Sequence, residues 1–193
     1  MIVDLEKAAM SFEDVRGFYE WLDANHLDCK ECYVLVDRGN EHKPGHIPYF
    51  QAVYAAICFG WIDSTVYSAG DLTVQRFTPR RKGSRWSELN KERARRMEQK
   101  RLMKTSGQAV LPDMTTDLDT LFPGIMRELR SHPEVMEKMA GMPPLYIRVR
   151  LDNIQSAATG PSKRYYRSRL DKFIKNTSEG VMYGEWNDSG NLD

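Results

Sequence analysis

The feature that most constrains the fold is an apolar segment with a proline at one end and a glycine at the other. Residues 50–59, between Pro48 and Gly60, leave little polar surface on any side of a helix. Proline suits the first turn of a helix because its missing N–H would have no partner there, and glycine readily adopts the left-handed conformation that ends a helix. A helix that is apolar all round must be buried. The sequence therefore predicts a central helix that the rest of the chain covers.

Short β-branched and aromatic segments on both sides of this helix predict a small sheet. Residues 32–36 fit one strand, and a further strand can begin at residues 61–62. Residues 65–67 and 72–77, joined by a short turn, are typical of a β-hairpin whose second strand ends at Pro79. We therefore expect an antiparallel sheet packed on the central helix.

Capping residues predict helices elsewhere in the chain. Ser11 is a suitable N-cap for a first helix, and Ser87 is suitable for a charged helix that extends to about Met103. Pro133 is expected to start one short helix, and Ser162 to cap another. The last of these helices places its apolar residues on one face: Tyr166, Leu170 and Phe173.

One tail segment fits two secondary structures. Every second residue from 145 to 151 is apolar, as in a strand, but apolar residues also recur at helical spacing over residues 147–158, and we favour the helix. The fold class is therefore α+β: helix-rich, with a small antiparallel sheet packed on a central buried helix and a mainly helical C-terminal region. At 193 residues the chain can bury a hydrophobic core. We expect a core over residues 1–113 and a C-terminal region over residues 114–193, packed together as one compact unit, with Trp186 docked back onto the domain.

The composition argues for a cytoplasmic protein. Residues 1–7 lack the basic start and apolar run of a secretory signal, and no apolar stretch approaches the roughly 20 residues that a membrane-spanning helix needs. The chain has three cysteines, an odd number that argues against a disulfide framework. Gly60 stands alone, so the chain has no dinucleotide-binding fingerprint, and we expect no cofactor.

A basic, aromatic block predicts where a ligand binds. The whole chain has a net charge of +1, yet residues 76–101 contain eleven Lys and Arg against three Glu, a local net charge of +8. A guanidinium group pairs with two phosphate oxygens at once, and aromatic faces stack on bases. The alternative is structural: the arginines pair with Asp63, Asp71 and Glu88, and the tryptophans fill the core. We expect a site for a phosphate-containing anion built from Arg76, Arg80, Arg81, Arg85, Trp61 and Trp86.

The same segments carry a resemblance to a known family. Residues 52–63 and 76–90, which include the runs ICFGWID and RFTPRR, together with Trp21 and His26 upstream, resemble the YdeI/OmpD-associated family. Members of that family have been linked to bacteriocin protection. The resemblance covers residues 12–103. It implies a protein that binds an anionic partner in stress or bacteriocin tolerance, and it implies no particular reaction.

Two other kinds of function stay open from the sequence. Asp63 can act as a general base, which would make the protein an enzyme acting on a phosphorylated or nucleotide substrate, or it can hold an arginine in place. A nucleic-acid-binding or protein-interaction module is the other alternative, because basic residues among aromatics also suit single-stranded nucleic acid. Five tail arginines either extend the basic surface or form a solvated helix face: Arg148, Arg150, Arg164, Arg167 and Arg169.

Two cysteines and two histidines imitate a zinc-ligand set. Cys29 and Cys32 are followed by His42 and His46, at spacings similar to those of zinc fingers. Pro44 lies between the histidines and cannot continue a helix, so the usual two-histidine helix is not available. We therefore expect no metal site, and these four residues are the weak candidates for one.

Overall fold

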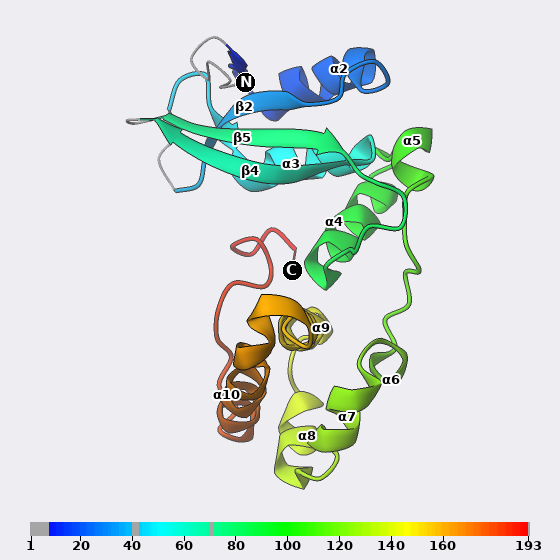
Figure 1. Cartoon of the computed structure of the whole chain (residues 1–193), viewed down its shortest axis with the longest axis vertical. Helices are drawn as coiled ribbons and strands as arrows, with labels where there is room; N and C mark the ends of the chain where they lie inside the picture. The colour runs from blue at the N-terminus through cyan, green and yellow to red at the C-terminus, as the bar shows by residue number, and fades with distance from the viewer. Residues whose placement is uncertain (1–7, 40–42, 70–71, 193) are drawn as a thin grey trace. The chain divides into compact units, whose positions relative to one another are not determined.

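The structure is a computed structural model that describes residues 8–39, 43–69 and 72–192 (Figure 1). The strands are β1 (Ala9–Met10), β2 (Cys32–Asp37), β3 (Ile47–Pro48), β4 (Trp61–Ala69) and β5 (Leu72–Pro79). The helices are α2 (Val15–Asn25), α3 (Tyr49–Cys58), α4 (Glu88–Gln99), α5 (Thr105–Gln108), α6 (Leu118–Leu121), α7 (Pro123–Leu129), α8 (Pro133–Met139), α9 (Pro144–Gln155) and α10 (Tyr166–Ser178), with a 3₁₀ helix η1 (Gly160–Tyr165) before α10.

The chain divides into two compact units. Unit 1 comprises Met1–Arg85 and Arg93–Pro112, and unit 2 comprises Trp86–Glu92 and Asp113–Asp193. The last change of unit, between Pro112 and Asp113, falls one residue before the predicted boundary, but the short segment Trp86–Glu92 at the start of α4 also groups with unit 2. The expectation that core and C-terminal region form one compact unit stays a prediction.

Unit 1 contains the sheet of this α+β fold, whose class the sequence predicts correctly. The strand order is β1-β2-β5-β4, with β3 paired to β2, and Figure 1 shows β5 between β2 and β4. The longer strands β2, β5 and β4 are antiparallel, as expected, whereas the two-residue strands β1 and β3 run parallel to β2. The sheet is therefore mixed. β4 also runs as one strand from Trp61, with a register shift between Asp63 and Val66.

The predicted central helix is α3, and it is buried. It contacts α2, β2 and β4. Gly60 follows it with a φ of +74°, in the left-handed region that favours glycine at a helix end. A Cβ at this position would lie 2.8 Å from the carbonyl oxygen of Ser106, so the close approach of the chain also requires glycine. The buried residues of α3 are Ala52, Val53, Ala55, Ala56, Ile57 and Cys58.

One of the two predicted serine caps in the first half of the chain is wrong. Asp14, not Ser11, caps α2 with its side chain. The Ser11 hydroxyl instead donates to the carbonyl of Gly45, 3.0 Å away, because a loop from a distant part of the sequence lies beside it. Ser87 does act as predicted at the start of α4, since its hydroxyl oxygen accepts from the backbone N–H of Asn90 at 3.2 Å.

Two other helix ends differ from prediction. α4 ends at Gln99 rather than near Met103, because Arg101 adopts a φ of +58°, which cannot continue a right-handed helix. Ser162 does not cap α10. It lies within η1, and α10 begins at Tyr166.

Unit 2 is helical, and its core is formed by α7, α8, α9 and α10. Residues 145–151, whose sequence fits either a strand or a helix, lie in the helix α9, as we favoured. Pro133 starts α8, as predicted. Tyr183 and Trp186 pack against the hydrophobic cluster of this unit, which confirms that the end of the chain docks back. Among the described residues, no helix combines the length and the apolar character that a membrane span requires.

Candidate functional site

Arg76, the first arginine of the predicted block, forms an ion pair with Glu31. It lies on β5, and its Nη2 and Nε are 2.6 Å and 2.8 Å from Oε2 of Glu31. These hydrogen bonds raise the pKa of Arg76 and lower the pKa of Glu31. The charge of Arg76 is therefore already balanced within unit 1.

Arg80 and Trp61 lie together, but both are buried. Arg80 is 6% exposed and Trp61 is 1% exposed. Nη1 of Arg80 donates to the carbonyl of Arg85 at 3.1 Å, and burial lowers the pKa of Arg80 to about 10 in spite of the opposing charge of Asp63. The two residues line a hollow of about 380 Å³ in unit 1, whose lining also includes His26, Lys30, Phe59 and Gly60.

The remaining residues of the predicted site are placed differently. Arg81 and Arg85 are exposed on the loop after β5, and neither lines that hollow. Trp86 belongs to unit 2 and is 6% exposed. Of the predicted site residues, the structure thus places Arg80 and Trp61 in the lining of this hollow, and Arg85 contacts Arg80 through its backbone carbonyl. Burial of both indole rings agrees with the structural alternative, in which the tryptophans fill the interior.

Asp63, the weak candidate for a general base, contacts a tyrosine of the central helix. Its carboxylate accepts a hydrogen bond from the Tyr49 hydroxyl at 2.7 Å, and the Arg38 guanidinium lies 3.8 Å from the centre of the Tyr49 ring. Burial, followed by the charge of Asp63, raises the pKa of Tyr49 to about 12. Asp63 therefore joins β4 to α3, and a catalytic role for it stays a prediction.

The described residues form no metal-ligand set. Cys32 and His46 are buried, Cys29 is half-buried, and no three His, Cys, Asp or Glu of the described ranges are grouped to hold a metal ion. Burial raises the pKa of the Cys32 thiol to about 12, which disfavours the thiolate that a metal requires. His42 lies outside the described residues.

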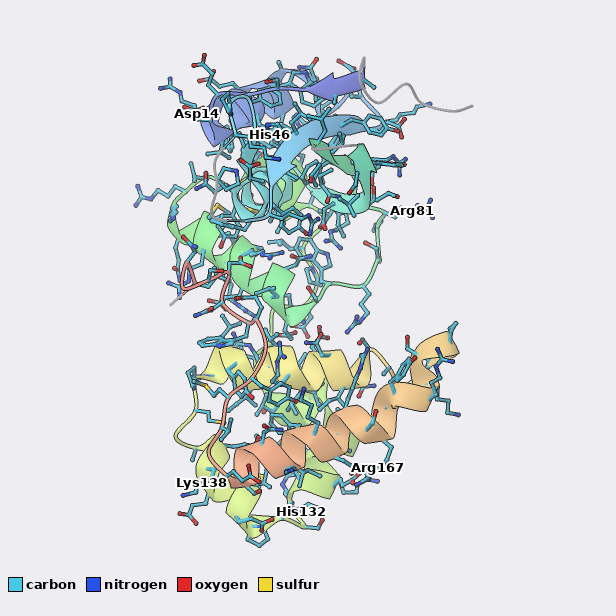
Figure 2. All side chains as sticks on the ribbon, turned by 90° about the vertical axis from the view of Figure 1, so that its left-hand side faces the viewer. Asp14, His46, Arg81, His132, Lys138 and Arg167 are labelled. Atoms are coloured by element: carbon cyan, nitrogen blue, oxygen red, sulfur yellow. The ribbon has the colours of Figure 1, made fainter. Side chains whose placement is uncertain are left out.

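Unit 2 contains a second hollow. It is lined by cationic residues, of which the sequence identified only some. This cationic hollow has a volume of about 360 Å³ and is lined by residues of α9, α10 and the C-terminal segment (residues 181–192). Figure 2 shows that segment leaving the end of α10 and running past α9. None of its lining residues is Asp or Glu, and three of them are cations. The lining residues are Arg150, Asn153, Ile154, Arg169, Lys172 and Tyr183.

Helical spacing explains why these side chains share one hollow. Arg150 and Asn153 are three residues apart on α9, and Arg169 and Lys172 are three residues apart on α10, so each pair lies on one helix face. Nη1 of Arg169 donates to the carbonyl of Asn153 at 2.7 Å, which joins the two helices at the edge of the hollow.

Arg150 is the buried cation of the hollow. It is 8% exposed, and its Nη2 donates to the carbonyl of Glu185 at 2.5 Å. Its buried Nε has no hydrogen-bond partner among the described residues. Within the same ranges, neither Arg150 nor Arg169 nor Lys172 forms an ion pair. Since buried charges are normally paired, an anion from outside the chain would complete this site.

Tyr183 forms the aromatic wall of the hollow. The Lys172 ammonium lies 4.7 Å from the centre of its ring, and the Arg150 guanidinium lies 5.4 Å from the same point. Burial, followed by the influence of Tyr146, raises the pKa of Tyr183 to about 12. The Tyr183 hydroxyl is therefore uncharged near neutral pH and can donate a hydrogen bond to an anion.

Arg148 lies two residues before Arg150 on α9, and its charge is balanced by carboxylates. Its Nε is 3.3 Å from Oε2 of Glu88, and its Nη2 is 3.0 Å from Oε2 of Glu92. Lys91 completes the network, with its Nζ 2.8 Å from Oε1 of Glu88. The side chains of Arg148 and Glu88 are 9% and 3% exposed. This buried network belongs to unit 2 and is structural.

The sequence marked the tail as basic but did not separate the roles of its cations. Arg150 and Arg169 line the hollow, whereas Arg167 pairs with Asp171 at 2.5 Å and also with Glu128. Lys172 was missed, although its spacing of three from Arg169 was a usable signal. Tyr183 offered no such signal, because its place in the wall depends on the return of the C-terminal segment.

Comparison with known proteins gives a family but no function. A family model described as "Domain of unknown function (DUF8412)" matches residues 10–110, just over half of the chain. No curated protein and no solved structure matches the chain. The match falls in the region that resembles the YdeI/OmpD-associated family, but it does not test that resemblance. The residues that line the cationic hollow all lie after the matched region.

Proposed function

The chain belongs to the DUF8412 family, and we propose that it binds a small phosphate-containing anion in the cationic hollow. One observation carries the proposal: Arg150, Arg169 and Lys172 meet at a hollow whose lining includes no carboxylate. Cations held this close repel one another, and a bound anion replaces that repulsion with attraction. The attraction is strongest at Arg150, because its surroundings exclude most of the water that would screen it.

The side chains of the hollow suit phosphate in charge and in shape. A guanidinium group can face two phosphate oxygens with parallel N–H bonds, and a lysine supplies a mobile point charge. A phosphate monoester carries a charge of about −1.5 to −2 near neutral pH, which three cations can balance. The hollow, of about 360 Å³, is at the lower end of the roughly 300–1,000 Å³ typical of small-molecule sites. These properties favour a small phosphorylated molecule.

The other parts of the sequence-based hypothesis stay proposals. The resemblance to the YdeI/OmpD-associated family suggests stress or bacteriocin tolerance as the biological setting. The hollow that contains Arg80 and Trp61 is a further place where an anion could bind in unit 1. An enzyme that uses Asp63 as a base, a nucleic-acid-binding module and a protein-interaction module are the remaining alternatives.

Isothermal titration calorimetry on the full chain tests the proposed function. The probes are inorganic phosphate, pyrophosphate and adenosine monophosphate, added to the wild type and to the double variant R169A/K172A. Each lost hydrogen bond to a charged group contributes about 1.5–3 kcal/mol, so we expect the double variant to bind at least about tenfold more weakly.

The matched control is K163A/K175A. It removes two exposed cations from η1 and α10 that do not line the hollow, and so it changes the net charge by the same amount. We expect its affinity to equal that of the wild type within about twofold. The proposal is wrong if none of the three probes binds the wild type, or if both double variants lose affinity equally.

A further inference from the structure

We propose that the C-terminal segment (residues 181–192) is the closing wall of the cationic hollow, and that this segment and a small phosphorylated molecule stabilise each other on unit 2. The inference rests on the proposed function, since it requires an anion in the hollow. It adds a structural reason why the hollow suits a small molecule rather than a nucleic-acid strand, and it assigns a role to a segment that has no regular secondary structure.

The segment is held on α9 by specific contacts. The backbone N–H of Tyr183 donates to the Tyr146 hydroxyl at 3.4 Å, and the rings of Tyr183 and Trp186 both lie edge-on to the Tyr146 ring, with centres 6.3 Å and 5.9 Å away. The carbonyl of Glu185 accepts from Nη2 of Arg150 at 2.5 Å. The docked position therefore depends on two α9 side chains, and one of them is the buried cation of the hollow.

Gly184 shows how closely the segment approaches that cation. Its φ is +69°, in the region that favours glycine. A Cβ added there would lie 2.5 Å from Nη1 of Arg150. A side chain at this position would therefore displace the Arg150 guanidinium group from where it now lies.

The segment also has internal order that does not involve the hollow. Oε1 of Glu185 accepts from the backbone N–H groups of Trp186, Asn187 and Ser189 at 3.1, 3.0 and 3.0 Å. These bonds, that of Ser189 first, lower the pKa of the Glu185 carboxyl. The carboxylate is thus occupied by its own loop, and the Glu185 group that faces Arg150 is the neutral carbonyl.

The segment and the hollow share Arg150 and Tyr183, which couples docking to binding. A guanidinium group has five N–H donors, and only one donor bond, to Glu185, is present at Arg150 among the described residues. An anion bound to other N–H groups of Arg150 would hold the guanidinium in the orientation that Glu185 accepts. It would also reduce the repulsion between the Arg150 and Lys172 cations, which both lie near the Tyr183 ring.

Thermodynamic linkage makes this coupling reciprocal. If the anion strengthens the docking of the segment by some factor, the docked segment must strengthen anion binding by the same factor. The wall also limits the ligand, because a nucleic-acid strand requires a continuous open groove with exposed aromatic faces. At Tyr183, the ring is half-buried and faces two cations.

Hydrogen–deuterium exchange of the full chain, with and without saturating inorganic phosphate, measures the docking of the segment directly. We expect phosphate to slow amide exchange in peptides that cover residues 181–192, by about fivefold or more if the coupling is of ordinary size. The variant Gly184→Ala should lose this protection and bind phosphate about fivefold more weakly, because its methyl group collides with Arg150.

Gly180→Ala is the matched control. Gly180 has a nearly identical φ of +71°, but a Cβ there would meet no atom within 4 Å, so this variant reproduces the backbone strain without the collision. We expect it to keep both affinity and protection. Circular dichroism on both variants checks that the helices are intact, and the wild-type exchange experiment does not depend on either variant folding.

The outcomes separate this inference from the proposed function. If phosphate binds the wild type but leaves exchange in residues 181–192 unchanged, or if the two glycine variants bind alike, the coupling is wrong and the proposed function stands. If none of inorganic phosphate, pyrophosphate and adenosine monophosphate binds the wild type, the proposed function fails and the inference fails with it. If a single-stranded oligonucleotide displaces phosphate and gives the same protection, the assignment to small molecules is wrong.

Discussion

Two basic regions of this protein differ in the groups that their cationic side chains contact. On β5 and the loop after it, where the sequence concentrates arginines, Arg76 is paired with Glu31 and Arg80 is buried with a bond to a backbone carbonyl. In the cationic hollow, where the basic residues are sparser in sequence, three cations share a lining without a carboxylate. Local density of arginine therefore does not show which cations lack a carboxylate partner, and the anion site that we propose rests on that second property.

The same contrast is present within the single helix α9. Arg148 and Arg150 are two residues apart, so they lie on different faces of the helix. One face meets Glu88 and Glu92, and the other meets the hollow. Substitutions at these two positions provide the most direct test of the comparison.

Arg148→Met should have the largest effect, and the effect should be on stability. It leaves the Glu88 carboxylate, 3% exposed, without its arginine partner. Removal of one partner from a buried ion pair typically lowers the free energy of unfolding by about 3–5 kcal/mol. Urea denaturation followed by tryptophan fluorescence measures this loss. A loss below about 1 kcal/mol would mean that the buried network does not depend on Arg148.

Arg150→Met should affect binding more than stability. We expect the affinity for inorganic phosphate, measured by calorimetry, to fall at least about tenfold, because a charge-assisted pair is lost. Its unfolding free energy should fall less than that of Arg148→Met, since no carboxylate is left behind. If the two variants lose the same free energy of unfolding, the proposed difference between the two faces of α9 is wrong.

The affinity for adenosine monophosphate should fall about fourfold between pH 7.5 and pH 5.5. The phosphate monoester loses its second charge near pH 6, which weakens its attraction to the cations of the hollow. The raised pKa of Tyr183, about 12, keeps that hydroxyl neutral throughout. Calorimetry at several pH values measures the change, and sulfate, which keeps its charge, should bind equally at both. An unchanged affinity for the monoester would show that charge does not govern binding.

Arg76→Ala should have the smallest effect. Its ion pair with Glu31 is partly exposed, and pairs of this kind contribute about 0–1 kcal/mol to the free energy of unfolding. The affinity for phosphate should not change beyond about twofold, because Arg76 lies in unit 1 and its charge is balanced there. A tenfold loss of affinity would instead indicate that the anion binds at the predicted basic block.

Several elements were predictable because their signals are local. The apolar run between Pro48 and Gly60 specifies a buried helix, Pro133 starts a helix, and the spacing of residues 147–158 favours the helix α9. Errors arose where a distant segment intervened. The carbonyl of Gly45, in a distant loop, accepts a hydrogen bond from the Ser11 hydroxyl, so Asp14 rather than Ser11 caps α2.

The candidate site was only partly predictable for the same reason. Arg80 and Trp61 line one hollow, because Arg80 directly follows β5 and Trp61 begins β4, which pairs with β5. The pairing of Arg76 with Glu31 joins residues 45 positions apart and could not be read from local spacing. Arg150 and Arg169 were noted as basic, but nothing in their local sequence distinguishes them from Arg148 and Arg167.

By itself the sequence determined the longer helices and the three longer strands, the α+β class and the places where basic residues gather, because periodicity, capping and turn residues act over a few positions. The tertiary structure alone decided which cations meet a carboxylate and which do not. That decision depends on contacts between α9, α10 and the end of the chain, and electrostatic energy depends on distance in space and on burial rather than on separation in sequence.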